Sequence, residues 1–184
     1  MMDAKSHWEH VYNTKRPDQV SWYRPHLDLS LDLITKVVSD RDARVVDVGG
    51  GEATQVDDLL AAGYRHVDVL DLSEKALQVA KDRLGELCDS VNWLRGDVTT
   101  YSFESNVYDV WHDRAVFHFL TDSMQREAYV HQVLRAAIEW HCQRRSVDGD
   151  RWKAVVRCRT RPPIAHYMVA NCFSTALWSL HQAS

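Results

Sequence analysis

The sequence lacks the long apolar runs, paired cysteines and excess of basic residues that would mark several large protein classes. Its apolar stretches fall short of the roughly 18 residues that cross a bilayer, and residues 1–10 lack the apolar core of a signal peptide. The four cysteines show no Cys-x-x-Cys pairing, so a secreted disulfide framework is not expected. A formal net charge of −4 provides no general attraction to nucleic acid. We expect a cytoplasmic protein with neither a membrane nor a nucleic acid as partner.

Glycine is also scarce, but three of the seven glycines are consecutive, at positions 49–51. The preceding run 44–48 is rich in β-branched valine and predicts a buried parallel strand. Residues 54–62 follow with Val56, Leu59 and Leu60 at helical spacing. Strand, glycine turn and helix together open a nucleotide-binding βαβ unit, in which the ligand lies over the carboxyl ends of the strands.

An acid at the end of the next strand narrows the type of ligand. The run 66–73 predicts a second strand that ends in an acid, Asp71, about 20 residues after Gly49. A carboxylate at this position accepts hydrogen bonds from ribose hydroxyls. Asp47 would repel a diphosphate but suits a cationic amino-acid group. Ala53 stands where a dinucleotide enzyme usually keeps a third glycine, which disfavours a nicotinamide-dependent oxidoreductase, the alternative. The implied ligand is an adenosine without phosphates.

These motifs resemble the class I S-adenosylmethionine-dependent methyltransferases. The matching stretches are 47–51, Asp71, 93–98 and 108–114, in family order across about residues 7–135. The resemblance implies an α/β fold, a Rossmann-like, mostly parallel sheet with helices on both faces. It also implies methyl transfer from S-adenosylmethionine, the expected cofactor, within a domain spanning residues 1–138. The cofactor-binding residues that it implies are Trp22, Asp47, Gly49, Gly50, Gly51, Asp71, Leu72, Asp97 and Val98.

Residues 7–25 carry four aromatic side chains around a polar centre: Trp8, Tyr12, Trp22 and Tyr23. Trp8 and Tyr12 are four positions apart and so share one face of a short helix. The resemblance implies that this segment is a lid over the methyl donor, with Trp22 nearest the cofactor. The alternative is that the aromatic residues simply cover the edge of the domain.

The loop after the fourth strand is dense with groups capable of chemistry. We expect Asp113 to be catalytic, as a carboxylate that orients an amine nucleophile, and His112, Arg114 and His118 to face the substrate. The alternative is that Asp113 pairs with Arg114 or caps local backbone. The histidines lack metal-ligand spacing, and this transfer needs no metal, so no metal is expected. The acceptor is a small molecule or a protein, with lysine as one candidate, and the sequence contains no signal for the oligomeric state.

The composition changes after about residue 138. Residues 139–184 hold three of the four cysteines and only one glycine, and their basic residues outnumber the acidic ones. The family would continue with a glycine turn and finish with an antiparallel hairpin, which we expect to be incomplete here. The abrupt change suggests an out-of-frame replacement of the family's own sequence, with ordinary divergence as the alternative because 153–159 still suits a strand. An altered C-terminus also leaves open a non-catalytic relative that binds an adenosine ligand.

Overall fold

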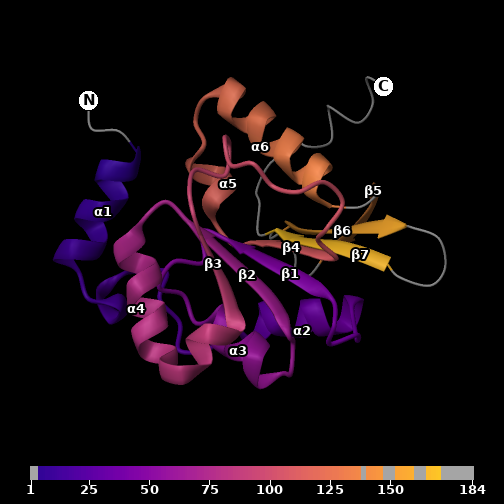
Figure 1. Cartoon of the computed structure of the whole chain (residues 1–184). Coiled ribbons are helices and arrows are strands. Elements are labelled where there is room, and N and C mark those ends of the chain that lie inside the picture. Colours follow the sequence, from indigo (N-terminus) through magenta and orange to yellow (C-terminus); the bar gives the residue numbers. More distant parts are fainter. Residues whose placement is uncertain (1–3, 138–139, 147–151, 160–164, 171–184) are drawn as a thin grey trace.

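One twisted sheet forms the centre of the molecule (Figure 1). The computed structural model describes residues 4–137, 140–146, 152–159 and 165–170, with side chains described from residue 5 to residue 137. Within these ranges the strand order is β3-β2-β1-β4-β7-β6-β5. The strands are β1 (Arg44–Val48), β2 (His66–Asp71), β3 (Val91–Arg95), β4 (Val110–Asp113), β5 (Trp140–Ser146), β6 (Trp152–Arg159) and β7 (Ala165–Ala170).

Helices cover both faces of this sheet. In Figure 1, α2 (Asp28–Val37), α3 (Gln55–Ala61) and α4 (Glu74–Leu84) lie below it, and α5 (Val116–Phe119) and α6 (Ser123–Ala136) lie above it. The N-terminal helix α1 (Ala4–Thr14) packs against α4, and short 3-10 turns occupy Pro17–Gln19 (η1) and Gly85–Ser90 (η2). None of the helices in the described ranges is both long enough and apolar enough to span a bilayer. The predicted α/β architecture is confirmed.

The alternation of strand side chains produces two separate cores. Val45, Val67, Val69 and Val110 join the buried cluster under α2, α3 and α4. Val46, Val48, Leu70 and Trp111 face the other way and join the cluster beneath α5 and α6. With both faces covered, β1 is buried along nearly its whole length. This explains why valines stand on both faces of β1, at positions 45, 46 and 48, rather than on one face only.

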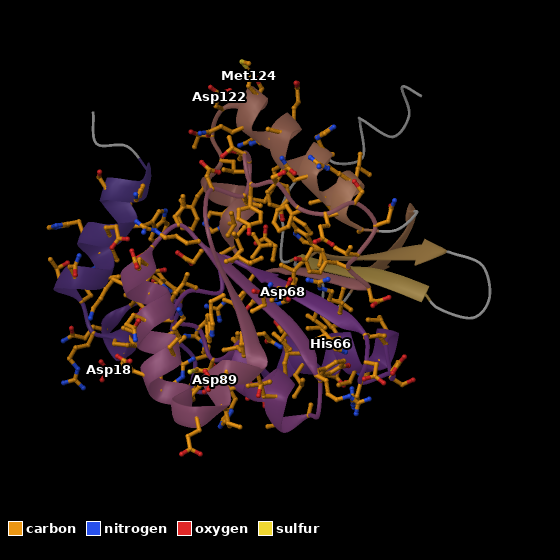
Figure 2. All side chains as sticks on the ribbon, viewed as in Figure 1. Asp18, His66, Asp68, Asp89, Asp122 and Met124 are labelled. Atoms are coloured by element: carbon orange, nitrogen blue, oxygen red, sulfur yellow. The ribbon has the colours of Figure 1, made fainter. Side chains whose placement is uncertain are left out.

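Two polar contacts fix elements around the cores. Asp68, labelled beside the sheet in Figure 2, accepts a hydrogen bond from the Tyr108 hydroxyl at 2.6 Å and pairs with Arg44 at 3.1 Å. Asp122 caps the outer end of α6 by accepting the Met124 N–H at 2.7 Å. The buried face of α6 packs over β4, where the Trp111 Nε1–H donates to the Tyr129 hydroxyl at 3.0 Å.

The C-terminal part of the sheet differs from the expectation of an incomplete antiparallel section. β7 pairs parallel with β4, whereas β6 pairs antiparallel with both β7 and β5. The strand expected at 153–159 corresponds to β6. Because main-chain groups supply the ladder hydrogen bonds, a change of composition does not by itself prevent pairing. The hypothesis about the origin of the tail concerns stretches that in large part lie outside the described residues, namely 138–139, 147–151, 160–164 and 171–184.

Candidate active site

A cavity of about 560 Å³ lies over the carboxyl ends of β1, β2, β3 and β4. Its walls come from the glycine turn, from the loops after β2, β3 and β4, and from the N-terminal segment between Trp8 and Leu27. Eleven of the residues predicted for the site line it: Trp22, Asp47, Gly49, Gly50, Asp71, Leu72, Asp97, Val98, His112, Arg114 and His118. Gly51 and Asp113 are predicted residues that lie outside this lining.

The glycine turn is packed so closely that side chains would not fit on it. Gly49 has φ +68°, and a Cβ there would collide with Val116 at the start of α5. A Cβ on Gly50 would lie 2.7 Å from an Asp47 carboxylate oxygen, and one on Gly51 would lie 2.7 Å from Asp71 Oδ2. The turn therefore presents bare backbone to the cavity and brings the acids of β1 and β2 close together. A ligand that needs close approach to peptide groups fits this cradle.

Asp71 ends β2 with its carboxyl group almost entirely buried, at 8% exposure. Oδ1 accepts the Ser73 N–H at 2.8 Å, and Oδ2 lies against Gly51. Burial raises the pKa of Asp71 to about 7; the nearby carboxylates of Asp47, Glu9 and Glu52 add to the rise and the Ser73 N–H opposes it. A buried carboxyl group with spare accepting capacity is suited to a ligand that brings hydroxyl donors.

Asp47 is held differently, by a series of buried hydrogen bonds that runs from β1 through β4 to α2. One of its oxygens lies 2.6 Å from His112 Nδ1, and His112 Nε2 lies 3.0 Å from the hydroxyl of Ser30 on α2. Asp47 is 3% exposed and His112 is 2% exposed. The histidine predicted to face a substrate therefore spends both ring nitrogens on protein partners. It positions Asp47 beneath the glycine turn.

Asp113 is fully buried and holds the turn from β4 into α5. Its oxygens accept the backbone N–H groups of Ala115, Val116 and Phe117 at 2.7–3.2 Å and the Tyr129 hydroxyl at 2.6 Å. Burial raises the pKa of Asp113, and these hydrogen bonds oppose that rise. The geometry favours the alternative weighed from the sequence, in which Asp113 caps local backbone.

The aromatic N-terminal segment closes one side of the cavity. The Trp8 ring lies at its centre, 5.9 Å from Tyr12, 5.9 Å from Trp22 and 5.0 Å from Phe119 between ring centroids. Arg114 donates to the Trp22 carbonyl at 2.7 Å, which ties the segment to the loop after β4.

The segment is also fixed on the side of β1 and α3. The Thr54 hydroxyl donates to the Arg24 carbonyl at 3.0 Å, and Asp58 on α3 accepts the Leu27 N–H at 2.8 Å. The aromatic wall is thus attached to three parts of the sheet domain.

The remaining polar residues of the lining divide into predicted and missed ones. Asp97, predicted as a ligand residue, accepts the backbone N–H and the hydroxyl of Thr99 at 2.8 and 2.7 Å through one oxygen, as a turn residue does. Sequence reasoning missed Glu52 and Gln125, both of which line the cavity. The signal for Glu52 was an acid placed directly after the glycines. Among the described residues, no group of three His, Cys, Asp or Glu side chains is arranged to hold a metal ion.

Comparison with known proteins places this geometry in context. Residues 45–137 match the family model described as "Methyltransferase domain". The eEF1A lysine and N-terminal methyltransferase of Mus musculus is 25% identical over 137 residues, which cover 74% of this chain and 19% of that protein. A ubiquinone/menaquinone biosynthesis C-methyltransferase of Roseobacter denitrificans is 34% identical over 71 residues, 37% of this chain and 28% of that protein. The chain thus spans about a fifth of the length of the mouse relative.

A solved structure shares the fold. The N-methyltransferase NodS of Bradyrhizobium japonicum, in complex with S-adenosyl-L-homocysteine, superimposes with a TM-score of 0.60 at 13% identity. The match covers 76% of this chain and 71% of NodS. At this identity the likeness concerns the fold alone.

Proposed function

The chain belongs to the methyltransferase-domain family, and from this premise we propose that it transfers a methyl group from S-adenosylmethionine to an amine nitrogen. The observation that carries the proposal is the cavity at the ends of β1 to β4, which combines a bare glycine turn with the buried carboxyl group of Asp71. We further propose that residues 1–138 are the donor-binding domain, that 7–25 form its lid, and that 139–184 are an atypical C-terminal tail.

The residues of this cavity fit the donor. Gly49 to Gly51, with Asp47 beneath them, would hold its methionine portion, because Asp47, Gly49 and Gly50 line the cavity at the carboxyl end of β1. Asp71 would accept from the ribose hydroxyls, as its position at the end of β2 supports. The Asp97 carboxylate and the Val98 N–H would contact the adenine. This donor has no diphosphate, so the site would not need the diphosphate-binding turn of a nicotinamide-dependent enzyme.

When bound, the donor supplies a methyl carbon made electrophilic by its sulfonium. What the protein contributes is alignment of the nucleophile and exclusion of water. The aromatic wall of Trp8, Trp22 and Phe119 would exclude water on the lid side. Asp113 would act indirectly, since it holds the loop that carries Arg114 and Val116 into the lining.

An amine acceptor agrees with the aromatic wall of the cavity. Trp8, Trp22 and Phe119 line the cavity, and aromatic ring faces favour an amine-bearing group over an anionic one. Three acids of the lining, Asp47, Asp71 and Asp97, would already serve the donor. The lysine and N-terminal methyltransferase relative supports an amine on a protein. Transfer to carbon is a second candidate, favoured by the short match to the C-methyltransferase.

The test is a mass-spectrometric assay with S-adenosylmethionine and two acceptor pools, small primary amines and lysine-containing peptides. We expect S-adenosylhomocysteine and a methylated amine to form with wild-type protein and to decrease strongly with Asp71→Ala. The matched control, Asp89→Ala, removes an acid that lies outside the cavity lining. A methyl group found on carbon would favour the second candidate. Donor binding without turnover on any acceptor class would instead indicate a non-catalytic relative.

A further inference from the structure

Glu52 is a buried acid of the cavity for which no side-chain hydrogen bond or ion pair is found among the described residues. It is 5% exposed, it lines the cavity, and Oε1 has no hydrogen-bond partner among the described residues. The cation that acts on Glu52, Arg83 on α4, already has other hydrogen-bond partners. Its three guanidinium nitrogens donate to Asp57 and to the main-chain carbonyls of Glu52 and Ala53 at 2.7–3.0 Å. Native proteins rarely leave a buried polar atom unpaired without a reason.

The neighbours of Glu52 further disfavour its ionised form. Asp71 and the Tyr12 hydroxyl both lie close enough to interact electrostatically with its carboxylate, and neither supplies positive charge. Burial raises the pKa of Glu52, opposed only in part by Arg83. The other acid at the glycine turn, Asp47, has a compensating partner in His112 at 2.6 Å. Glu52 is therefore the carboxyl group at this turn that a cationic ligand would satisfy.

We propose that Glu52 pairs with a positive charge of the bound methyl donor, and this inference rests on the proposed function. The donor carries two such charges, the sulfonium and the α-ammonium, and a carboxylate that directly follows the glycine turn is suited to either. The absence of a metal-ligand group among the described residues favours an organic cation over a metal ion. Asp71 would accept hydrogen bonds from the neutral ribose. Glu52, beside it, would pair with a positive charge of the same ligand.

Three ligands separate the two sources of charge. S-adenosylmethionine carries the sulfonium and the ammonium, S-adenosylhomocysteine carries the ammonium alone, and 5′-methylthioadenosine carries neither. Calorimetry would measure all three with wild-type protein, with Glu52→Gln, and with Glu104→Gln as the matched control. Glu104 is an exposed acid outside the cavity lining. Glutamine keeps the size and removes the charge.

We expect Glu52→Gln to weaken S-adenosylmethionine by about 10- to 100-fold and to change 5′-methylthioadenosine by less than about threefold. An equal loss for S-adenosylhomocysteine assigns the contact to the ammonium, and a loss confined to S-adenosylmethionine assigns it to the sulfonium. The same change for all three ligands, or no change, would overturn the inference. Wild-type protein that binds none of the three would overturn the proposed function as well.

Thermal melting without ligand provides a readout that does not depend on binding or activity. Because the buried Glu52 Oε1 has no hydrogen-bond partner among the described residues, Glu52→Gln should melt at the same temperature as wild type or higher, even though it binds the donor less tightly. Glu52→Ala, which removes the whole side chain, should show the same selectivity among the three ligands. A melting temperature that falls while all three affinities stay unchanged would make Glu52 a structural residue and refute the pairing.

Discussion

The acidity of Asp71 leads to a specific expectation for how ligand affinity depends on pH. Ribose hydroxyls donate to an ionised carboxylate more strongly than to a protonated one. The pKa of Asp71 in the free protein is raised to about 7, mainly by burial, so near neutrality a large share of the molecules hold a proton there. Binding stabilises the ionised form and thereby lowers this pKa in the complex. The complex then holds fewer protons than the free protein, and affinity falls as pH falls through 7.

The size of the effect follows from the distance between the working pH and that pKa. Below it, each pH unit costs up to a factor of ten, which is about 1.4 kcal/mol. At pH 5, about two units below the pKa, the affinity should be up to about 100-fold weaker than above pH 8. The groups that act on Asp71 are Asp47, Glu52 and Glu9, together with the Tyr12 hydroxyl and the Ser73 N–H. Burial, with a smaller contribution from the three acids, keeps the pKa of Asp71 high, and the Ser73 N–H opposes this rise.

The assay is calorimetry with 5′-methylthioadenosine at pH 5, 6, 7 and 8. This ligand has the ribose and lacks an α-amino group, which would itself titrate near pH 8. Asp71→Asn is the matched variant: it should bind more weakly at pH 8 and lose most of the pH dependence. An affinity that is constant from pH 8 to pH 5 in wild type would refute the reasoning. An equal slope in Asp71→Asn would assign the titration to a different group.

Three further expectations concern other parts of the site. Asp113→Asn should lower the free energy of unfolding by about 2–4 kcal/mol in urea denaturation, because an amide group would face the Phe117 N–H and the Tyr129 hydroxyl. Normal stability with reduced turnover would instead support a catalytic role for Asp113. Gly49→Ala should destabilise by more than about 1 kcal/mol and weaken donor binding, given its positive φ and the collision with Val116, and wild-type melting would contradict this. Donor should protect residues 8–25 from proteolysis and shift tryptophan fluorescence, with a smaller shift in Trp22→Phe, whereas equal cleavage with and without donor would make the segment structural cover.

The parts of the site that could be predicted are those encoded by neighbouring residues. The glycine turn follows a valine-rich strand, and Asp71 ends the next strand, so each is defined within a few positions of the chain. Parallel strands bring their carboxyl ends to one edge of the sheet, and this geometry gathers Asp47, Asp71 and Asp97 without further information. The lining of the cavity agrees with that expectation.

The parts that could not be predicted depend on contacts between distant elements. Asp113 resembles a catalytic acid in the sequence, but its environment includes Tyr129, contributed by α6. Whether an acid on a loop faces a cavity or the core depends on how that helix packs, which the local pattern does not encode. His112 is similar, because one ring nitrogen reaches Asp47 on β1 and the other reaches Ser30 on α2. The antiparallel pairing of β5 and β6 uses main-chain groups, so side-chain composition was a weak guide to it.

The acids around the cavity differ in how well the protein compensates them, and this difference couples stability to ligand binding. His112 contacts Asp47, and three N–H groups and a hydroxyl donate to Asp113, although burial raises the pKa of Asp113 as well. Asp71 has one N–H donor, Glu52 Oε1 has none among the described residues, and burial raises the pKa of both. Between the ordinary pKa of an acid and its raised value, the folded state binds more protons than the unfolded state.

The contribution of Asp71 and Glu52 to the stability of the free protein should therefore fall as pH rises from about 4 to about 7. A ligand that donates hydrogen bonds to Asp71 and positive charge to Glu52 removes the cause of that fall, because it stabilises both ionised carboxylates. The unfolding free energies of the free protein and of the complex with S-adenosylmethionine should then diverge as pH rises, which thermal melting at fixed ligand concentration measures. Parallel profiles across this range would mean that the ligand leaves both acids as they are in the free protein.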